Sequence, residues 1–124
     1  MKSETFQFSF EKLDVWKLAR SFSLKIYKLT KSFPYNEKQG LKDQLRRAAV
    51  SISSNIAEGS SRFSRKDFAR YIQISYGSLM EALSQLYTAL DLGYIDDKVF
   101  NDCKTKIHEI AKKLSALRKS ILEK

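Results

Sequence analysis

Hydrophobic residues recur every three or four positions along most of the chain, which is the spacing of one face of an α-helix. The first such pattern runs from about Glu11 to Ser32 and is followed by Pro34, a residue that stops helices. Its predicted inner face comprises Val15, Ala19, Phe22, Ile26, Leu29 and Phe33. The sequence therefore predicts a first amphipathic helix of about six turns.

The second pattern is rich in small residues on two faces. We expect it to begin with Asn36 as N-cap and Gln39 as capping-box partner, and to end near Gly59 as a left-handed C-terminal residue. One face carries Leu41, Leu45, Ala48, Ile52, Asn55, Ile56 and Gly59, and the other carries Ala49, Val50, Ser53 and Ala57. Small side chains on both faces would let this helix approach two neighbours closely.

The third pattern opens with a capping box formed by Ser64 and Asp67 and closes at Gly93. Its predicted inner face comprises Phe68, Ile72, Ser75, Leu79, Leu83, Leu86 and Leu90. Gly77 lies in the middle, where glycine costs about 1 kcal/mol relative to alanine. We expect this cost to be offset by close approach of a neighbouring backbone.

Asp96 or Asp97 is expected to cap the fourth helix. A heptad seam follows, made of Phe100, Cys103, Ile107, Ile110, Leu114, Leu117 and Ile121. Four amphipathic helices joined by short breaks predict an all-α fold, an up-down-up-down antiparallel four-helix bundle. We interpret residues 1–124 as one domain, in which alternating phenylalanines over residues 1–10 form an extended N-terminal arm.

The chain of 124 residues is strongly basic, with a formal net charge of +9. This balance favours an anionic partner such as RNA or DNA, although an ordinary solubility role remains the alternative. The charge is also uneven, because residues 71–97 hold four acidic and no basic residues. The acidic third helix and its following loop therefore separate basic segments.

Residues that usually carry catalysis or bind metals are scarce. Cys103 is the only cysteine and His108 the only histidine, so the usual ligands cannot assemble a metal site. Some four-helix-bundle ribonucleases place an arginine four to six residues before a histidine, but Lys104, Cys103 and Asp102 occupy those positions here. We therefore predict no enzyme activity and no cofactor.

The sequence also favours a particular compartment. A lone cysteine fits a reducing environment, and the N-terminal residues lack the apolar core of a signal peptide. No window approaches the roughly 20 apolar residues of a membrane span. We expect a cytoplasmic protein without a membrane partner.

Basic residues gather on the polar side of the first helix. Lys17, Arg20, Lys28 and Lys31 lie together on a helical projection, where they could follow a phosphate backbone or form an ordinary solvated face. A second candidate group is Arg62, Lys66 and Arg70. The basic residues of the last helix are scattered around its polar side, and we interpret them as solvating.

Arg46 and Arg47 lie among the small residues of the second helix. They need either an acid inside the protein, with Glu58 or Glu81 as candidates, or a phosphate outside it. We favour buried ion pairs, within a subunit or across subunits, which set register more than they add stability. Four apolar residues off the main stripes, Trp16, Tyr27, Val50 and Tyr87, together with the second small-residue face, favour a subunit interface.

Several motifs carry a family resemblance. They are Phe10-Glu-Lys-Leu-Asp-Val-Trp-Lys-Leu-Ala19, Phe33-Pro34, Gln44-Leu-Arg-Arg-Ala-Ala-Val-Ser51, Ser54-Asn-Ile-Ala-Glu-Gly59, Tyr76-Gly-Ser-Leu-Met-Glu81 and Leu92-Gly-Tyr-Ile95. Together they resemble the four-helix-bundle family of 23S ribosomal RNA intervening-sequence proteins, over about residues 10 to 120. The family is also similar to the accessory subunit of diversity-generating retroelements.

This resemblance implies an assembly and partners. Some family members are encoded within insertions of bacterial ribosomal RNA genes, and the retroelement subunit is a basic, barrel-like pentamer that binds nucleic acid and a reverse transcriptase. By resemblance, this chain would form a homopentamer with a basic outer surface. The alternative is a protein-interaction scaffold, for example an accessory subunit for a reverse transcriptase.

Overall fold

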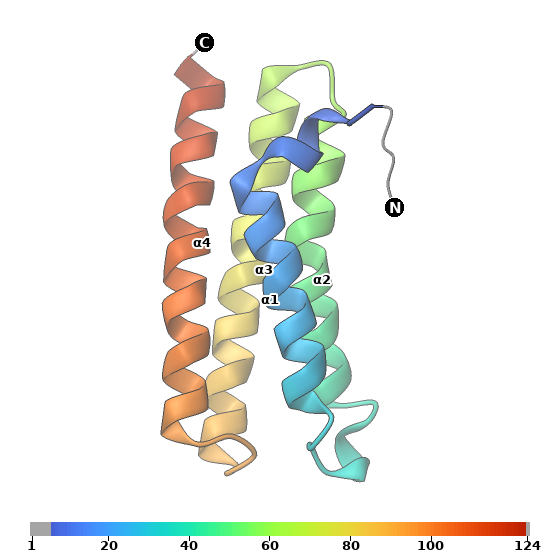
Figure 1. The fold of residues 1–124 in the computed structure, drawn as a ribbon, viewed down its shortest axis with the longest axis vertical. Coiled ribbons are helices and arrows are strands. Elements are labelled where there is room, and N and C mark those ends of the chain that lie inside the picture. The colour runs from blue at the N-terminus through green and yellow to red at the C-terminus, as the bar shows by residue number, and fades with distance from the viewer. Residues whose placement is uncertain (1–5, 124) are drawn as a thin grey trace.

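The computed structural model describes residues 6–123, which form four long helices (Figure 1). They are α1 (Asp14–Thr30), α2 (Leu41–Ser60), α3 (Arg65–Asp91) and α4 (Asp97–Glu123). Consecutive helices run in opposite directions and pack beside each other. The predicted up-down-up-down four-helix bundle is confirmed.

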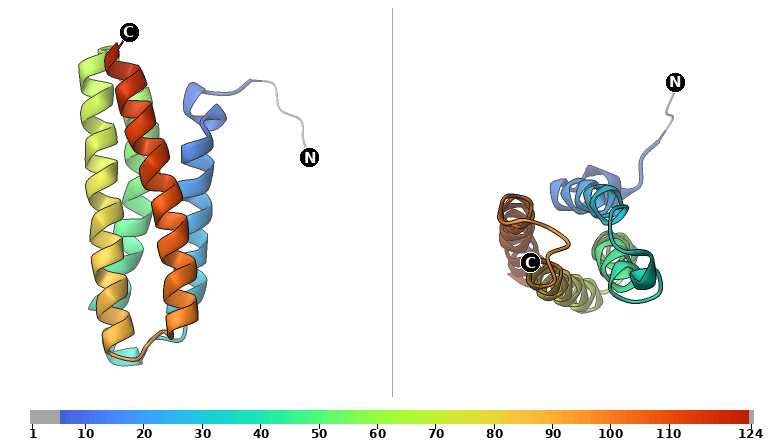
Figure 2. Two further views of the ribbon diagram at one scale, coloured as in Figure 1. Left: turned by 90° about the vertical axis from the view of Figure 1, so that its left-hand side faces the viewer. Right: turned by 90° about the horizontal axis from the view of Figure 1, so that it is seen from below.

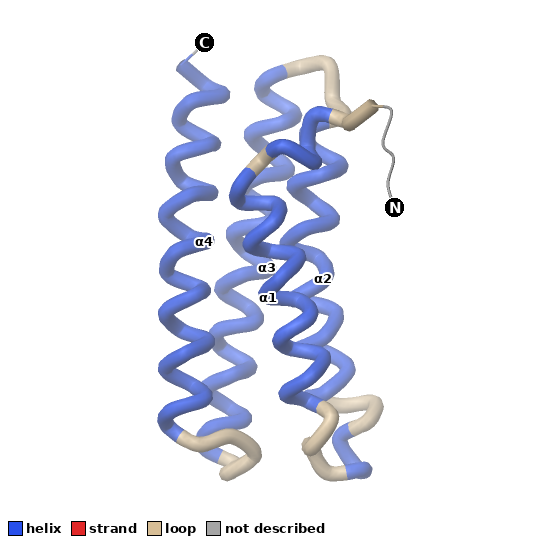
Figure 3. The backbone as a smooth tube through the Cα atoms, viewed as in Figure 1, coloured by secondary structure: helices blue, strands red, loops and turns tan. Residues whose placement is uncertain are grey.

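Two short 3-10 turns precede the first two helices (Figure 3). The first, η1 (Ser9–Lys12), is separated from α1 because the backbone of Leu13 is extended, with ψ at 123°. The helix expected from about Glu11 therefore begins later. The expected extended arm is a 3-10 turn where it meets α1, and its residues 1–5 lie outside the described part of the chain.

The prediction that Asn36 caps the second helix is wrong. Asn36 lies inside the second 3-10 turn, η2 (Tyr35–Glu37), and α2 begins only at Leu41. The side chain of Glu37 supplies the cap instead, because its Oε1 accepts a hydrogen bond from the Leu41 N–H at 3.0 Å. The polar pattern was the correct signal, but the capping group is one residue further along the chain.

Glu37 also links this turn to the far end of α3, since its Oε2 accepts a hydrogen bond from the Tyr94 hydroxyl at 2.8 Å. The Leu41 N–H and the Tyr94 hydroxyl both lower the pKa of Glu37 from its ordinary 4.5. The hydrogen bond to Glu37 and burial raise the pKa of Tyr94 above its ordinary 10.0.

These shifts make the stability of the fold depend on pH. A lowered carboxyl pKa stabilises the fold above about pH 4.5, and this contribution is lost as the pH falls. A raised phenol pKa acts in the opposite sense, so its contribution is lost as the pH rises beyond about 10.0.

We therefore expect Tyr94→Phe to lower the free energy of unfolding at neutral pH, and to lower it less as the pH falls below about 4.5. Urea unfolding of both proteins at pH values above and below this point measures the difference. Tyr35→Phe is the control, because Tyr35 is 86% exposed. A deficit in Tyr94→Phe that stays constant through the acid range would contradict the linkage.

The core lies between the helices and follows the predicted stripes. The buried residues include most of each predicted inner face, for example Phe22, Ile52, Leu79 and Leu114. Where α2 meets α3, small polar residues replace large apolar ones. The buried Ser75 Oγ donates to the backbone oxygen of Ile52 at 2.8 Å, so this hydroxyl is satisfied across the helix pair.

Three glycines behave differently from one another. Gly93 has φ at +78°, and its N–H donates to the Leu90 oxygen, so the prediction that it closes α3 is confirmed. The prediction that α2 ends near Gly59 is confirmed, because the helix ends at Ser60, but the prediction that Gly59 is left-handed is wrong. Gly59 lies buried within α2, where an added Cβ would be 2.6 Å from the Cβ of Tyr71. The prediction for Gly77 is also wrong within this chain, because an added Cβ there would meet nothing within 4 Å. The close approach of α2 and α3 is at Gly59.

The bundle is closed unevenly. The pairs α1–α2, α2–α3 and α3–α4 are extensively packed, whereas α1 and α4 approach each other least (Figure 2). A shallow apolar depression lies between them, lined by Leu24, Leu29 and Val99 with Lys25 and Lys28 at its edge. Among residues 6–123, no helix is both long and apolar enough to cross a membrane.

Candidate nucleic-acid interface

The α1 basic face consists of Lys17, Arg20, Lys28 and Lys31, and all four residues are exposed. The buried side of α1, including Phe22 and Ile26, turns these residues outward. From Lys17 to Lys31 the face spans about 21 Å, because a helix rises about 1.5 Å per residue. The structure thus places the four residues on one side of one rigid element.

The charges of the α1 basic face are not neutralised locally. Within residues 6–123, none of the four forms an ion pair with a carboxylate. The guanidinium of Arg20 lies over the Trp16 ring, 5.5 Å from its centroid, which orients the cation without cancelling its charge. The α1 basic face therefore has the charge, exposure and length to contact several phosphates.

The second predicted group lies where α2 turns into α3. Arg62 is held by Glu58 at 2.9 Å and by the Tyr71 hydroxyl at 2.6 Å, and it stacks on the Tyr71 ring. Arg70 covers the same ring, 5.0 Å from its centroid. Lys66 is exposed and forms no ion pair among the residues described. Arg62 is thus partly neutralised, while Lys66 is available.

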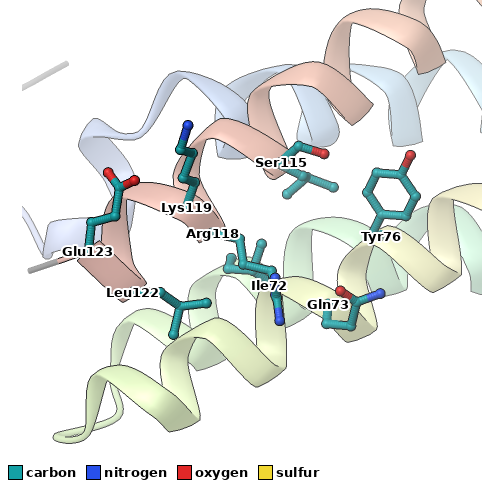
Figure 4. Close-up of a pocket in the computed structure, with 9 residues that line it drawn as sticks. Ile72, Gln73, Tyr76, Ser115, Arg118, Lys119, Leu122 and Glu123 are labelled. Carbon is teal, nitrogen blue, oxygen red and sulfur yellow. The ribbon is translucent and has the colours of Figure 1, made fainter.

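Sequence reasoning missed part of this end of the bundle. Arg118 of α4 lines a depression together with Lys66 and Arg70 of α3. On its other side, Arg118 borders a neighbouring groove of about 360 Å³ with an apolar floor that includes Ile72 and Leu122 (Figure 4). The basic residues of α4 were interpreted as scattered, because no local pattern shows that the two helix ends meet.

The ion pairs predicted within one subunit, of Arg46 and Arg47 with Glu58 or Glu81, are wrong. Arg46 donates from Nε to the Thr30 hydroxyl at 2.8 Å and from Nη2 to the Tyr27 backbone oxygen at 3.0 Å. Its guanidinium also lies over the Tyr27 ring, 4.4 Å from the centroid. Arg46 therefore binds the C-terminal carbonyl end of α1, where a helix dipole favours a cation.

The presumed partners are occupied elsewhere. Arg47 forms an exposed pair with Asp43 at 2.9 Å, one helical turn away. Glu58 pairs with Arg62, and Glu81 accepts a hydrogen bond from the Gln85 amide at 3.2 Å. The two neighbouring arginines thus have different roles, one fixing α2 against α1 and the other lying in solvent.

This difference predicts unequal effects on stability. Arg46→Met keeps an aliphatic side chain but removes both hydrogen bonds to α1, and we expect it to lower the free energy of unfolding by about 1–3 kcal/mol. Arg47→Met is the matched control, with an expected effect within about 0.5 kcal/mol because its ion pair is exposed. Urea unfolding measures both, and equal losses would contradict the assignment.

The four off-stripe apolar residues do not form one patch. Tyr27 is 40% exposed and lies under Arg46, and Val50, which is 39% exposed, follows Arg46 by about one turn of α2. Trp16 packs on Phe10 of η1, with ring centroids 4.9 Å apart. Tyr87 packs on Phe100, with ring centroids 4.6 Å apart, on the α3–α4 side. The predicted interface residues therefore divide between two different sides of the bundle.

Asn55 belongs to the α2–α3 contact. Its amide donates to the backbone oxygen of Ser51 at 2.8 Å and to the Ser51 hydroxyl, which in turn bonds to Ser78. Cys103 is buried, which raises the pKa of its thiol and makes it a core residue. His108 is exposed, and no cluster of three metal-ligating side chains occurs in the part of the chain described.

The fold and the surface define a class: a small antiparallel four-helix bundle with exposed cations along one helix and at one end. Comparison with known families is more specific, because the model of the 23S rRNA-intervening sequence protein family matches residues 11–116. The chain belongs to this family. The resemblance stated from its motifs is confirmed.

One solved structure supports the same architecture. It is a protein of unknown function from the S23 ribosomal protein family of Bacteroides thetaiotaomicron VPI-5482, 24% identical, with a TM-score of 0.76. The match covers 85% of this chain and 98% of that one, and at this identity it shows the fold alone. The search of curated proteins found no significant match.

Proposed function

We propose that this protein is a non-enzymatic, homo-oligomeric module that binds RNA or DNA electrostatically through the phosphate backbone. The observation that carries the proposal is the α1 basic face, with four exposed cations along about 21 Å of helix. Contacts to phosphate position a protein on nucleic acid without reading sequence. The residues described here offer no element built to read base edges in a groove, so affinity should depend mainly on charge.

The family supports an RNA or DNA partner only by association. Its name refers to an insertion in ribosomal RNA, and the similarity to the retroelement accessory subunit adds nucleic-acid binding as a family expectation. The net charge of +9 agrees with both. The unpaired cations of the α1 basic face favour a phosphate partner whatever the family is called.

The proposed assembly is a ring, a homopentamer by resemblance to the retroelement subunit. A ring needs a heterologous interface, in which two different surfaces of each subunit meet. Exposed apolar residues on two sides of the bundle, Tyr27 with Val50 and Tyr87, fit that requirement. Sedimentation at several concentrations tests the subunit number.

A second candidate function is an adaptor for another protein, for example a reverse transcriptase. The observation that favours it is the exposed apolar surface next to the α1 basic face, including Leu24, which is 57% exposed between the cations. An adaptor would capture one protein selectively, and nuclease treatment would not release that protein.

The proposal is tested with fluorescence anisotropy, using purified protein freed of nucleic acid by nuclease. Labelled structured RNA and labelled duplex DNA are titrated at low salt. We expect submillimolar dissociation constants for both the RNA and the DNA, as is typical of non-specific phosphate contacts. No binding to either would leave the charge as a solubility feature and favour the adaptor.

A further inference from the structure

Phe63 lies in the connection between α2 and α3 with its side chain fully in solvent, at 108% relative exposure. It is the most exposed large apolar residue among those described. Leaving a phenylalanine in water forgoes the stabilisation that burial would give. Its position therefore calls for an explanation outside the packing of this chain.

The turn that carries Phe63 is fixed without the help of its ring. The N–H groups of Ser61 and Arg62 donate to the backbone oxygens of Glu58 and Gly59 at the end of α2. On the other side, Ser64 Oγ accepts the Asp67 N–H at 3.0 Å and caps α3. The ring is thus presented from a hydrogen-bonded turn.

Cations surround this ring along the chain. Arg62 precedes it, and Arg65 and Lys66 follow within three residues. Arg65 and Lys66 are exposed and pair with no carboxylate in the described residues, and Arg118 of α4 joins Lys66 beside the same end of the bundle. A protein partner that buried Phe63 would have to desolvate these charges, which costs free energy unless each charge is paired.

We propose that the Phe63 turn binds an unpaired nucleotide, with the base stacked on the ring and the flanking phosphates on Arg65 and Lys66. Stacking on an aromatic ring beside a cationic track is how proteins hold single strands without reading sequence. The Tyr71 ring is already covered by Arg62 and Arg70, whereas the Phe63 ring is free for a base. Bases within a duplex are stacked on each other and cannot occupy the ring unless they unstack.

The inference rests on the proposed nucleic-acid binding and adds a preference for unpaired segments. It is tested with Phe63→Ala against a short oligouridylate and an RNA duplex of equal length. Single-strand affinity should fall about 5- to 150-fold, and duplex affinity should stay within about twofold. Phe63→Trp should preserve single-strand binding. Tyr35→Ala is the matched control, because Tyr35 is an exposed aromatic residue in η2, which precedes α2, whereas Phe63 follows α2.

A second readout isolates stacking from charge. An oligonucleotide that carries 2-aminopurine should lose fluorescence on binding the natural protein, and lose less on binding Phe63→Ala at saturating concentration. Circular dichroism confirms that both proteins are equally helical.

Each failure has a distinct meaning. If the natural protein binds neither nucleic acid, the proposed function fails and this inference fails with it. If binding is normal but Phe63→Ala changes nothing, or lowers single-strand and duplex affinity equally, the function stands and the stacking site is overturned. Loss of binding to phosphatidylserine vesicles, with single-strand affinity unchanged, would also overturn it and assign the turn to a membrane surface.

Discussion

Replacing Lys17 and Lys28 with glutamate should weaken binding to duplex DNA by roughly 100-fold at about 0.1 M salt. Each phosphate contact releases close to one counterion, and at this salt concentration one contact contributes about tenfold in affinity. Both side chains are exposed and lie on the same side of α1, so their reversal leaves the core unchanged. Fluorescence anisotropy measures the affinity, and circular dichroism should show unchanged helicity.

The control for this variant has the same net charge. Lys112→Glu with Lys113→Glu changes two exposed lysines of α4 that belong to neither proposed basic group. We expect a much smaller loss, from long-range charge alone, which salt screens. Equal losses in the two double variants would show that net charge matters and that the α1 basic face has no special role.

The second large effect concerns two glycines that look alike in the sequence. Gly59→Ala should destabilise the protein by roughly 1–3 kcal/mol, because the new methyl group would overlap the Cβ of Tyr71 and α3 would have to move. Gly77→Ala should instead stabilise it by about 0.5–1 kcal/mol, since alanine suits a helix better and has open space there. The two variants should differ by roughly 1.5–4 kcal/mol.

Urea unfolding of both variants measures this difference directly, with the unfolding slope as a check on two-state behaviour. The same free energy of unfolding for the two variants would contradict the close approach of α2 and α3 at Gly59. A destabilising Gly77→Ala would contradict the open space at that position and indicate a partner against α3.

The sequence was sufficient to predict the four helices and their inner faces, because burial in a bundle imposes a local period. It also identified Ser64 and Gly93 correctly, since each acts on its own neighbours along the chain. The local errors concern helix ends, namely the start of α1, the Asn36 cap and the conformation of Gly59. The larger errors concern contacts between distant segments. Arg46 binds Tyr27 and Thr30, respectively 19 and 16 residues earlier, and no local pattern distinguishes that arrangement from an ion pair.

In the candidate site too, features within one helix could be predicted, and contacts between distant segments could not. The α1 basic face could be predicted because its residues share one helix. The cationic end near Phe63 could be predicted only in part, because it joins the start of α3 to the end of α4. The sequence does show Phe63 close to Arg65 and Lys66. This pattern indicates a binding site only once the structure shows that the ring is exposed.

The most direct test of the account is the salt dependence of duplex DNA binding by the natural protein, compared with a variant in which Lys17, Arg20, Lys28 and Lys31 are all alanine. If four phosphates are neutralised by α1, the plot of log Kobs against log salt should have a slope of about −3.6 or steeper. The variant should lose about 3.6 of that slope. A natural protein with a slope near zero, or a variant with an unchanged slope, would contradict binding through the α1 basic face.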